Sequence, residues 1–433
     1  MLCGYADTAM HRLRNPVRPY AWGSSTHIPL LCGQPVSPDP VAEMWFGAHP
    51  ADPSKGDDGR GLDLVIEQDP VAALGAGVVQ TFGPRLPFLM KLLAAAEPLS
   101  LQVHPDTDQA AQGFANQSAA GVPLGDPARS YQDRFHKPEL IYALTRFEGM
   151  AGFRDTSRTV AILRMFELDF LDRIADELDR ADVPATALRE IVTRLLDRPG
   201  PETARDLRRL GEAAVEAEKR SHHPRSRRRP PEVDASSVER ESLRVFSQTV
   251  KLIDRYPEDP GVLVTLLLNH VVLAAGDAMF LDAGIIHAYT SGFGVEIMAS
   301  SDNVLRAGLT PKHVDIPELL RITDFAPIPP PRWPRQLGPR ADCITLAPPV
   351  GEFELVIHER HGDESELVVD GPAIVLCLAG AVTAEAGTGQ LHLDQGQACF
   401  VAATDSPVTL TGRGRAAIAR TPAQQPAMPA RTA

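Results

Sequence analysis

The stretch Leu99-Ser-Leu-Gln-Val-His-Pro-Asp106 places two polar side chains, Gln102 and His104, two residues apart in an otherwise apolar segment. Side chains alternate between the two faces of an extended strand, so this spacing puts both on the same side. The apolar run favours a strand, and Pro105 ends it. We therefore predict a strand that ends at a pocket.

Two other segments offer side chains that could join this pair at a metal site. Glu139 closes the segment His-Lys-Pro-Glu, and His287 closes the segment Gly-Ile-Ile-His. Two imidazoles, a carboxylate and an amide oxygen are plausible ligands for a zinc-like ion. Taken singly, each residue could instead be a strand-end polar group, a surface ion-pair partner or a buried histidine. If all four polar side chains converge in the interior of a β-barrel, which would otherwise exclude water, a bound metal ion explains why they are there.

Charged residues elsewhere could form an anion site beside this metal. Glu296 lies between two apolar residues and can point inward from a strand, while Arg306 and Lys312 bracket a glycine-containing loop that an anion could approach closely. A surface ion-pair loop is the simpler alternative. Lys91 lies within an apolar predicted strand. Its ammonium group therefore either extends to the solvent or binds a buried anion.

The composition of the 433 residues is that of an ordinary globular protein, with 43% apolar and 23% charged residues. A net charge of −13 argues against nucleic acid or an anionic membrane as the partner. The short basic run at 221–231 is broken by proline and is interpreted as an exposed loop.

The N-terminus has no secretory pattern, and the longest apolar stretch, Val262–Ala275, is too short to span a bilayer. Five scattered cysteines predict mostly buried thiols and a cytoplasmic protein.

The order of patterns along the chain predicts a mainly β protein with an α-helical insertion. Short runs separated by Pro and Gly predict strands at Tyr20–Trp22, Ala42–Phe46, Phe88–Leu93, Leu99–His104 and Leu140–Ala143. Asp155 can cap a first helix, and amphipathic patterns follow at Val160–Leu168, Ile174–Leu178, Leu188–Leu196, Ala204–Ala217 and about Val238–Tyr256. Strand-like sequence returns at Val262.

An internal repeat suggests two related jelly-roll, or cupin, sandwiches. The segment 276–283 aligns with 396–403, each a glycine turn followed by an apolar strand. The alignment places Pro407 opposite His287, so the second sandwich would lack that ligand. We expect a discontinuous catalytic cupin domain at 15–152 and 257–335, a helical domain at 153–256, and a C-terminal jelly roll at 340–422 without metal ligands.

Six segments together resemble the type I mannose-6-phosphate isomerases, a family of zinc-dependent cupin enzymes. They occur in the family's order and cover residues 15 to about 325: Asn15–Gly23, Ala42–Pro50, Leu99–Asp106, His136–Glu139, Gly284–Tyr289 and Ser301–Lys312. The sequence departs from the family pattern at Thr107, where a lysine often stands, and has little recognisable signature after residue 340. Neither departure removes a proposed ligand.

The resemblance implies reversible conversion of mannose 6-phosphate to fructose 6-phosphate through an enediol or enediolate, with one zinc ion per chain. It implies a phosphosugar as the only partner, with no nucleic acid and no membrane, and we expect a monomer. The zinc ligands would be Gln102, His104, Glu139 and His287. Catalysis would use Arg306, with Lys137 and Glu296 at the sugar end, and the phosphate would be held by Lys91, Ser100 and Lys312.

Two other functions compete with the isomerase. A cupin that only binds a sugar phosphate could keep the fold and lose the chemistry, but it would have little need of four ligands and Arg306. An iron-dependent cupin oxygenase normally uses two histidines and one carboxylate, and Gln102 and the basic cluster fit it poorly. The isomerase is the function that the sequence favours.

Overall fold

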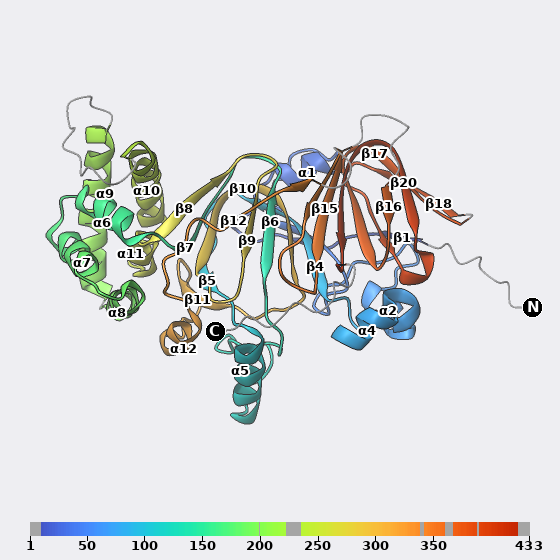
Figure 1. The fold of residues 1–433 in the computed structure, drawn as a ribbon, viewed down its shortest axis with the longest axis horizontal. Helices are drawn as coiled ribbons and strands as arrows, with labels where there is room; N and C mark the ends of the chain where they lie inside the picture. The colour runs from blue at the N-terminus through green and yellow to red at the C-terminus, as the bar shows by residue number, and fades with distance from the viewer. Residues whose placement is uncertain are drawn as a thin grey trace, which may run out of the picture.

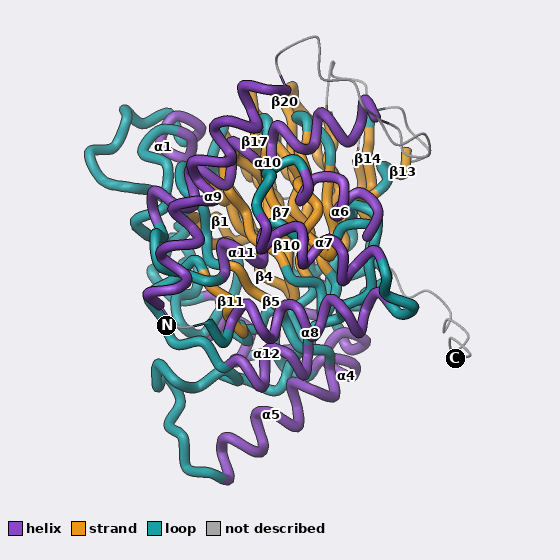
Figure 2. The backbone as a smooth tube through the Cα atoms, turned by 90° about the vertical axis from the view of Figure 1, so that its left-hand side faces the viewer, coloured by secondary structure: helices purple, strands orange, loops and turns teal. Residues whose placement is uncertain are grey.

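The computed structural model describes residues 10–198, 200–221, 235–337, 342–359, 367–387 and 389–422. Two β-sheets lie next to each other through the middle and right of Figure 1, and helices cover the left-hand end. Figure 2, viewed from that end, shows these helices in front of the strands. All the strand ladders are antiparallel, as the predicted sandwiches require.

The first, 11-stranded sheet is organised around one long strand, β10, which pairs with β4, β5, β6 and β7. A strand with so many neighbours brings residues from distant parts of the sequence to one place. The strands of this sheet are β2 (Val17–Arg18), β3 (Glu43–Phe46), β4 (Phe88–Ala95), β5 (Leu101–Val103), β6 (Glu139–Ala143), β7 (Phe147–Phe153), β8 (Leu268–Leu273), β9 (Ala278–Leu281), β10 (His287–Ala299), β11 (Leu305–Gly308) and β12 (Arg332–Trp333).

The second, 9-stranded sheet is C-terminal apart from β1, which joins it from the other end of the sequence by pairing with β19. Phe88 of the first sheet and Leu355 and Phe400 of the second belong to one buried apolar cluster, so the two sheets share a core. The strands are β1 (Met10–Leu13), β13 (Gln336–Leu337), β14 (Cys343–Leu346), β15 (Glu354–Glu359), β16 (Leu367–Val369), β17 (Ala373–Ala386), β18 (Gly389–Asp394), β19 (Ala398–Val401) and β20 (Val408–Arg420).

Helices α6 to α11 form the cover seen in Figure 2. The Asp155 carboxylate caps α6 by accepting a hydrogen bond from the Arg158 backbone N–H at 3.1 Å. Their bounds are α6 (Thr156–Arg164), α7 (Asp169–Asp179), α8 (Pro184–Leu196), α9 (Gly200–Ser221), α10 (Ala235–Arg255) and α11 (Gly261–Thr265). The remaining helices are α1 (His27–Leu31), α2 (Leu62–Gln68), α3 (Pro70–Leu74), α4 (Ala76–Phe82), α5 (Thr107–Ala119) and α12 (Ile316–Ile322), with a short 3-10 helix at Ala403–Asp405.

A buried ion pair joins the helical region to the first sheet. Arg154 follows β7 and is 0% exposed. Its Nε donates to Glu241 Oε1 of α10 at 2.9 Å, and its Nη1 donates to the Leu266 carbonyl at 2.8 Å. A buried charge needs such partners because desolvation is costly. The helices are therefore tied to the sheet by polar contacts as well as by apolar packing.

Most predicted elements are confirmed, with the mainly β class and the helical insertion among them. Strands β3, β4, β5 and β6 lie within or next to the predicted runs, and the helices begin and end within a few residues of the amphipathic patterns. The predicted basic loop at 221–231 lies outside the described residues, apart from Ser221 at the end of α9.

Two predicted strands are wrong. Tyr20–Trp22 forms a turn, because the Gly23 N–H bonds back to the Tyr20 carbonyl at 2.9 Å. The strand expected from Val262 is instead helix α11, followed by β8 from Leu268. Every residue of α11 is buried, and a short, wholly apolar run has no periodicity that separates a helix from a strand.

The internal repeat has the same local structure in both copies. Gly276 and Gly396 both have positive φ, at 90° and 82°, and strands β9 and β19 follow them. His287 begins the 13-residue strand β10, and Pro407 immediately precedes the 13-residue strand β20. The C-terminal copy thus has proline where the first copy has an imidazole.

Within the described ranges, no helix combines the length and the apolar character needed to cross a membrane. Cys32, Cys343, Cys377 and Cys399 are free thiols, and all but Cys32 are buried, as expected. Cys3 lies outside the described residues.

Candidate metal centre and adjoining cleft

Three predicted ligands meet where β5, β6 and β10 come together. His104 follows β5, Glu139 begins β6 and His287 begins β10. His104 Nε2 lies 3.2 Å from Glu139 Oε1, and His287 Nε2 lies 3.4 Å from Glu139 Oε2. One ligand atom from each residue lies within 4.8 Å of those of the other two. A single ion can therefore contact all three.

The fourth predicted ligand, Gln102, lies directly opposite His287 in the pairing of β5 with β10. Its amide Nε2 is 3.3 Å from His287 Nε2. A half-turn of the amide would exchange its nitrogen for its oxygen at this position. Gln102 is thus placed beside the three other ligands, on the side of the strand that the sequence predicted.

Both imidazoles are oriented by backbone carbonyls. His104 Nδ1 lies 2.7 Å from the Asn303 carbonyl oxygen, and His287 Nδ1 lies 2.8 Å from that of Ile285. A carbonyl can only accept, so each Nδ1 carries the proton and each Nε2 keeps its lone pair free. Both lone pairs then face Glu139, which is the arrangement typical of metal-binding histidines.

The residues present fit a zinc ion. His104 Nε2 and Glu139 Oε2 are buried and make no hydrogen bond, which is costly for polar atoms unless a cation satisfies them. Burial, together with Lys137, lowers the pKa of His104 to about 4. Burial opposes ionisation of Glu139, but Lys137 and His104 lower its pKa well below the usual range. A neutral imidazole and a charged carboxylate are the forms that bind metal.

A cleft of about 1340 Å³ opens beside these ligands. It is lined by eight of the ten residues that the sequence predicted for the site, and the other two, His104 and His287, are fully buried next to it. The eight are Lys91, Ser100, Gln102, Lys137, Glu139, Glu296, Arg306 and Lys312. The structure thus brings all the predicted site residues together.

Lys91 is held by carboxylates on the wall of this cleft. It is 7% exposed, and its Nζ lies 3.0 Å from Glu296 Oε2 and 4.0 Å from Glu43 Oε1. Burial alone would lower the pKa of Lys91, but Glu296 and Glu43 raise it. Burial also raises the pKa of Glu296. Lys91 therefore keeps its charge, and Glu296 is a carboxyl group able to carry a proton.

Two further cations that line the cleft, Arg306 and Lys312, have no such partner among the described residues. Arg306 lies opposite Gln102 in the pairing of β11 with β5, and Lys312 is exposed on the loop that follows. Burial lowers the pKa of Arg306, and burial and Arg306 together lower that of Lys312. Within the described part of the chain, neither side chain forms an ion pair. Both are available to an anion that enters the cleft.

Sequence reasoning missed several residues of the cleft. Glu43, Asp302, Tyr289 and Tyr20 line it, and burial raises the pKa of Tyr289 well above its usual value, so its hydroxyl stays protonated. All four lie in the segments that carry the family resemblance, which is the signal that could have identified them.

His136 belongs to the same segment as Lys137 and Glu139 but points elsewhere. Its Nε2 lies 2.7 Å from Glu352 Oε1, which precedes β15 of the second sheet. The imidazole thus links the region of the cleft to the C-terminal sheet and takes no part in the metal cluster of the described residues.

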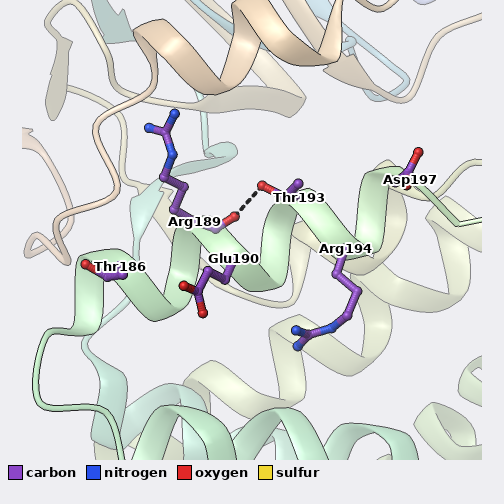
Figure 3. A pocket seen from close by; sticks show the side chains of 6 residues that line it. All are labelled: Thr186, Arg189, Glu190, Thr193, Arg194 and Asp197. Atoms are coloured by element: carbon purple, nitrogen blue, oxygen red, sulfur yellow. Dashed lines mark hydrogen bonds between the residues drawn. The ribbon is translucent and has the colours of Figure 1, made fainter.

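A second hollow, of about 520 Å³, lies along α8 (Figure 3). Its six lining residues come from this one helix and its C-terminal end, and Arg194 is bound to Glu177 at 2.6 Å. It contains none of the predicted site residues and brings no set of side chains together. It has the character of an exposed helix face.

Comparison with known proteins gives a consistent result. A family model described as the catalytic domain of type I phosphomannose isomerase matches residues 10–156. The mannose-6-phosphate isomerase of Escherichia coli (strain K12) is 40% identical over 414 residues, which cover 94% of this chain and 98% of that protein. The mannose-6-phosphate isomerase of Homo sapiens is 31% identical over 413 residues, covering 90% and 92%.

Solved structures match over nearly the whole chain. The crystal structure of mannose 6-phosphate isomerase from Salmonella typhimurium, described as bound to substrate (f6p) and a metal atom (zn), superposes with a TM-score of 0.81 at 34% identity. The match covers 95% of this chain and 99% of that one. A structure of mannose 6-phosphate isomerase bound with zinc and yttrium matches with the same score and coverage.

Proposed function

Because this chain belongs to the type I phosphomannose isomerase family, we propose that it interconverts mannose 6-phosphate and fructose 6-phosphate with one zinc ion per chain. The observation that carries this proposal is the convergence of His104, Glu139 and His287 beside a cleft with two unpaired cations. Relatives of known name and near-full coverage support the same reaction.

Gln102, His104, Glu139 and His287 would hold the zinc ion. Bound there, zinc would supply the positive charge that stabilises negative charge developing on a substrate oxygen. The protein's own contribution is preorganisation, because backbone carbonyls fix both imidazoles before any ligand arrives.

The reaction moves a proton between C1 and C2 of the sugar, so a side chain must accept and return it. Lys137 and Glu296 are the candidates. Lys137 Nζ lies 2.9 Å from Glu139 Oε1, at the metal end of the cleft. Glu296 is buried beside Lys91, and burial raises its pKa, which suits a carboxyl group that takes up a proton.

Arg306 would stabilise the enediolate that forms between the two proton transfers. It lies next to the metal ligand Gln102 in the sheet, and no carboxylate of the described residues forms an ion pair with its guanidinium. A cation that remains unpaired until the substrate develops charge acts mainly on the transition state.

The phosphate group would be held by Lys312 and Ser100, with Lys91 adding positive charge nearby. Lys312 and Ser100 line the cleft, whereas Lys91 is already bound to Glu296 at 3.0 Å. Binding energy from the phosphate, which does not react, would position C1 and C2 at the zinc end.

The direct test combines metal analysis with a turnover assay. The purified protein should contain about one zinc per chain and convert mannose 6-phosphate to fructose 6-phosphate, and His287→Ala or Gln102→Ala should lower both quantities. A protein that binds zinc and phosphosugar without turnover would instead support the non-catalytic sugar-phosphate binder. A protein that binds no zinc would refute the ligand set.

The division into a catalytic domain at 15–152 and 257–335, a helical domain at 153–256 and a C-terminal domain at 340–422 is part of this proposal, as are a monomer and a cytoplasmic location. Four free thiols support the location. Light scattering on the purified protein would test the oligomeric state.

A further inference from the structure

A buried polar cluster lies behind the metal ligand His104. It consists of Asp133, Ser301 and Asn303, and we call it the Asn303 cluster. Ser301 is 1% exposed and Asn303 is 0% exposed. The cluster joins two segments far apart in the sequence: the loop before β6 and the loop between β10 and β11.

The Asn303 side chain uses its full hydrogen-bonding capacity within this cluster. Its Nδ2 donates to the carbonyl oxygens of Phe135 at 2.8 Å and Asp133 at 2.9 Å. Its Oδ1 accepts from the backbone N–H groups of Gln132 at 2.8 Å and Asp133 at 3.2 Å. Its Nδ2 also donates to Asp133 Oδ1 at 3.2 Å, so five bonds from one buried amide hold residues 132–135 in a single geometry.

The Asp133 carboxylate completes the cluster from the other side. Its Oδ1 lies 2.9 Å from Ser301 Oγ, and its Oδ2 accepts from the backbone N–H of Asp302 at 2.8 Å. Ser301 Oγ in turn accepts from the backbone N–H of Asn303 at 3.2 Å. The backbone of 301–303 is therefore fixed at successive residues.

This fixed backbone presents the one carbonyl that orients His104. The Asn303 oxygen accepts the His104 Nδ1 proton at 2.7 Å, so Nε2 is left to face Glu139 at 3.2 Å. The same cluster holds Phe135, four residues before Glu139. Two metal ligands on different strands are thus positioned by one set of hydrogen bonds.

We infer that Asp133, Ser301 and Asn303 are positioning residues that determine the affinity of the site for its metal, by holding His104 and Glu139 in ligating geometry before the ion binds. This inference rests on the metal role proposed above for His104. Loss of a group that orients a metal ligand typically weakens metal binding by about 10- to 100-fold.

The experiment measures the zinc dissociation constant of each apoprotein by competition with a chromogenic chelator. Ser301→Ala removes the hydrogen bonds of one hydroxyl and should weaken zinc binding by roughly tenfold, and Asn303→Ala, which removes the five bonds of the amide, by up to about 100-fold. Substituted with Co²⁺, both variants should show an altered visible absorption spectrum, because the ligand geometry changes.

Ser242→Ala is the matched control. Ser242 is also 0% exposed and its hydroxyl donates to the Glu239 carbonyl at 2.9 Å, but it lies in α10. It should lower the melting temperature of the apoprotein without changing zinc affinity. If Asn303→Ala does not fold, Ser301→Ala decides the question.

The possible failures are distinguishable. If the wild-type protein binds no stoichiometric zinc, the proposed function fails and this inference with it. If the wild type binds zinc and a folded Ser301→Ala or Asn303→Ala variant binds it equally tightly, with an unchanged Co²⁺ spectrum, the inference alone is overturned.

Discussion

Arg306 occupies a place where its charge can act on the reaction without holding the metal. It lies across the strand pair from Gln102 and is not one of the three residues whose ligand atoms converge. We expect Arg306→Ala to keep its zinc and fold while kcat falls by roughly 10²- to 10³-fold, the usual effect of removing one transition-state charge partner. Steady-state kinetics and metal analysis test this together, and a near-normal kcat would contradict it. Arg306→Lys should recover part of the loss, since it keeps the charge without the planar fork.

Lys312 differs from Arg306 because its side chain is exposed, whereas that of Arg306 is partly buried, and we assign it to the phosphate. Lys312→Ala should raise the KM for mannose 6-phosphate by about 10- to 100-fold, equivalent to one charge-assisted hydrogen bond. The inhibition constant of unphosphorylated mannose should change little. Lys251→Ala, an exposed lysine on α10, serves as the control. Equal weakening of both sugars would remove Lys312 from the phosphate site.

At the scale of residues, the ligand set could be predicted because its chemistry is visible in residue types and spacing. The orientation of those ligands could not. The tautomers of His104 and His287 depend on carbonyl groups of Asn303 and Ile285, and a carbonyl carries no signature in the sequence. For the same reason nothing in the sequence separates His136, which bonds to Glu352, from its neighbours in the motif.

Among the connecting elements, the segment between α10 and α11 approaches β11 and the loop after it, which carry Arg306 and Lys312. Asp259 lies on this segment, and its Oδ1 accepts from the Gly261 N–H at 2.7 Å while its Oδ2 accepts from the Thr310 N–H at 3.2 Å. Gly308 has φ +136°, and a Cβ there would lie 2.7 Å from Asp259 Oδ1. One carboxylate thus joins the end of the helical region to the loop between Arg306 and Lys312.

We expect Asp259→Ala to loosen this loop and to raise the KM for mannose 6-phosphate by roughly tenfold, about 1.4 kcal/mol, with a smaller effect on kcat. Asp69→Ala is a suitable control, because that carboxylate also accepts a backbone N–H, from Ala72 at 3.0 Å, but caps α3. Steady-state kinetics on both variants decide the matter. An unchanged KM in Asp259→Ala would show that the loop holds its shape without this contact.

At the scale of elements, periodicity predicted the amphipathic helices well, since each buries one face. It failed where an element is buried on all sides. Helix α11 has no polar face, so Val262 and its neighbours look as much like a strand as a helix. The turn at Tyr20–Trp22 was missed because aromatic residues favour strands, whereas here Gly23 closes a tight turn against Ala42.

In the molecule as a whole, the helical region is inserted into the chain between β7 and β8, so its attachment contributes to the stability of the sheet that carries the site. Arg154 and Glu241 form the polar part of that attachment. Their pairing across 87 residues could not be predicted, because arginine and glutamate are frequent on helix surfaces. The burial of Arg154 becomes visible only in the tertiary structure, not in the sequence.

The same pair predicts how stability depends on pH. Burial would raise the pKa of Glu241, but Arg154 and Arg158 lower it to about 2 from its ordinary value of 4.5. A carboxyl group whose pKa is lowered by folding stabilises the protein above its unfolded pKa. Its contribution, about 3 kcal/mol from the size of the shift, should therefore be complete above pH 4.5 and be lost as the pH falls toward 2. Burial and Arg154 also lower the pKa of His270, to about 3 from its ordinary value of 6.5, so this histidine destabilises the protein as the pH falls from 6.5 toward 3.

Comparison of wild type with Glu241→Gln separates the two groups, since His270 is common to both proteins. Near pH 7 the variant should be less stable by roughly 3–5 kcal/mol, because Arg154 remains buried without its carboxylate. The difference should shrink as the pH falls from 4.5 toward 2, when Glu241 of the wild type also becomes neutral. Glu216→Gln, which removes an exposed ion pair with Lys219, should change the free energy of unfolding very little, because solvent screens exposed pairs. Denaturant unfolding at several pH values measures these differences, and a gap between wild type and Glu241→Gln that stayed constant down to pH 2 would show that the charge of Glu241 does not contribute to stability.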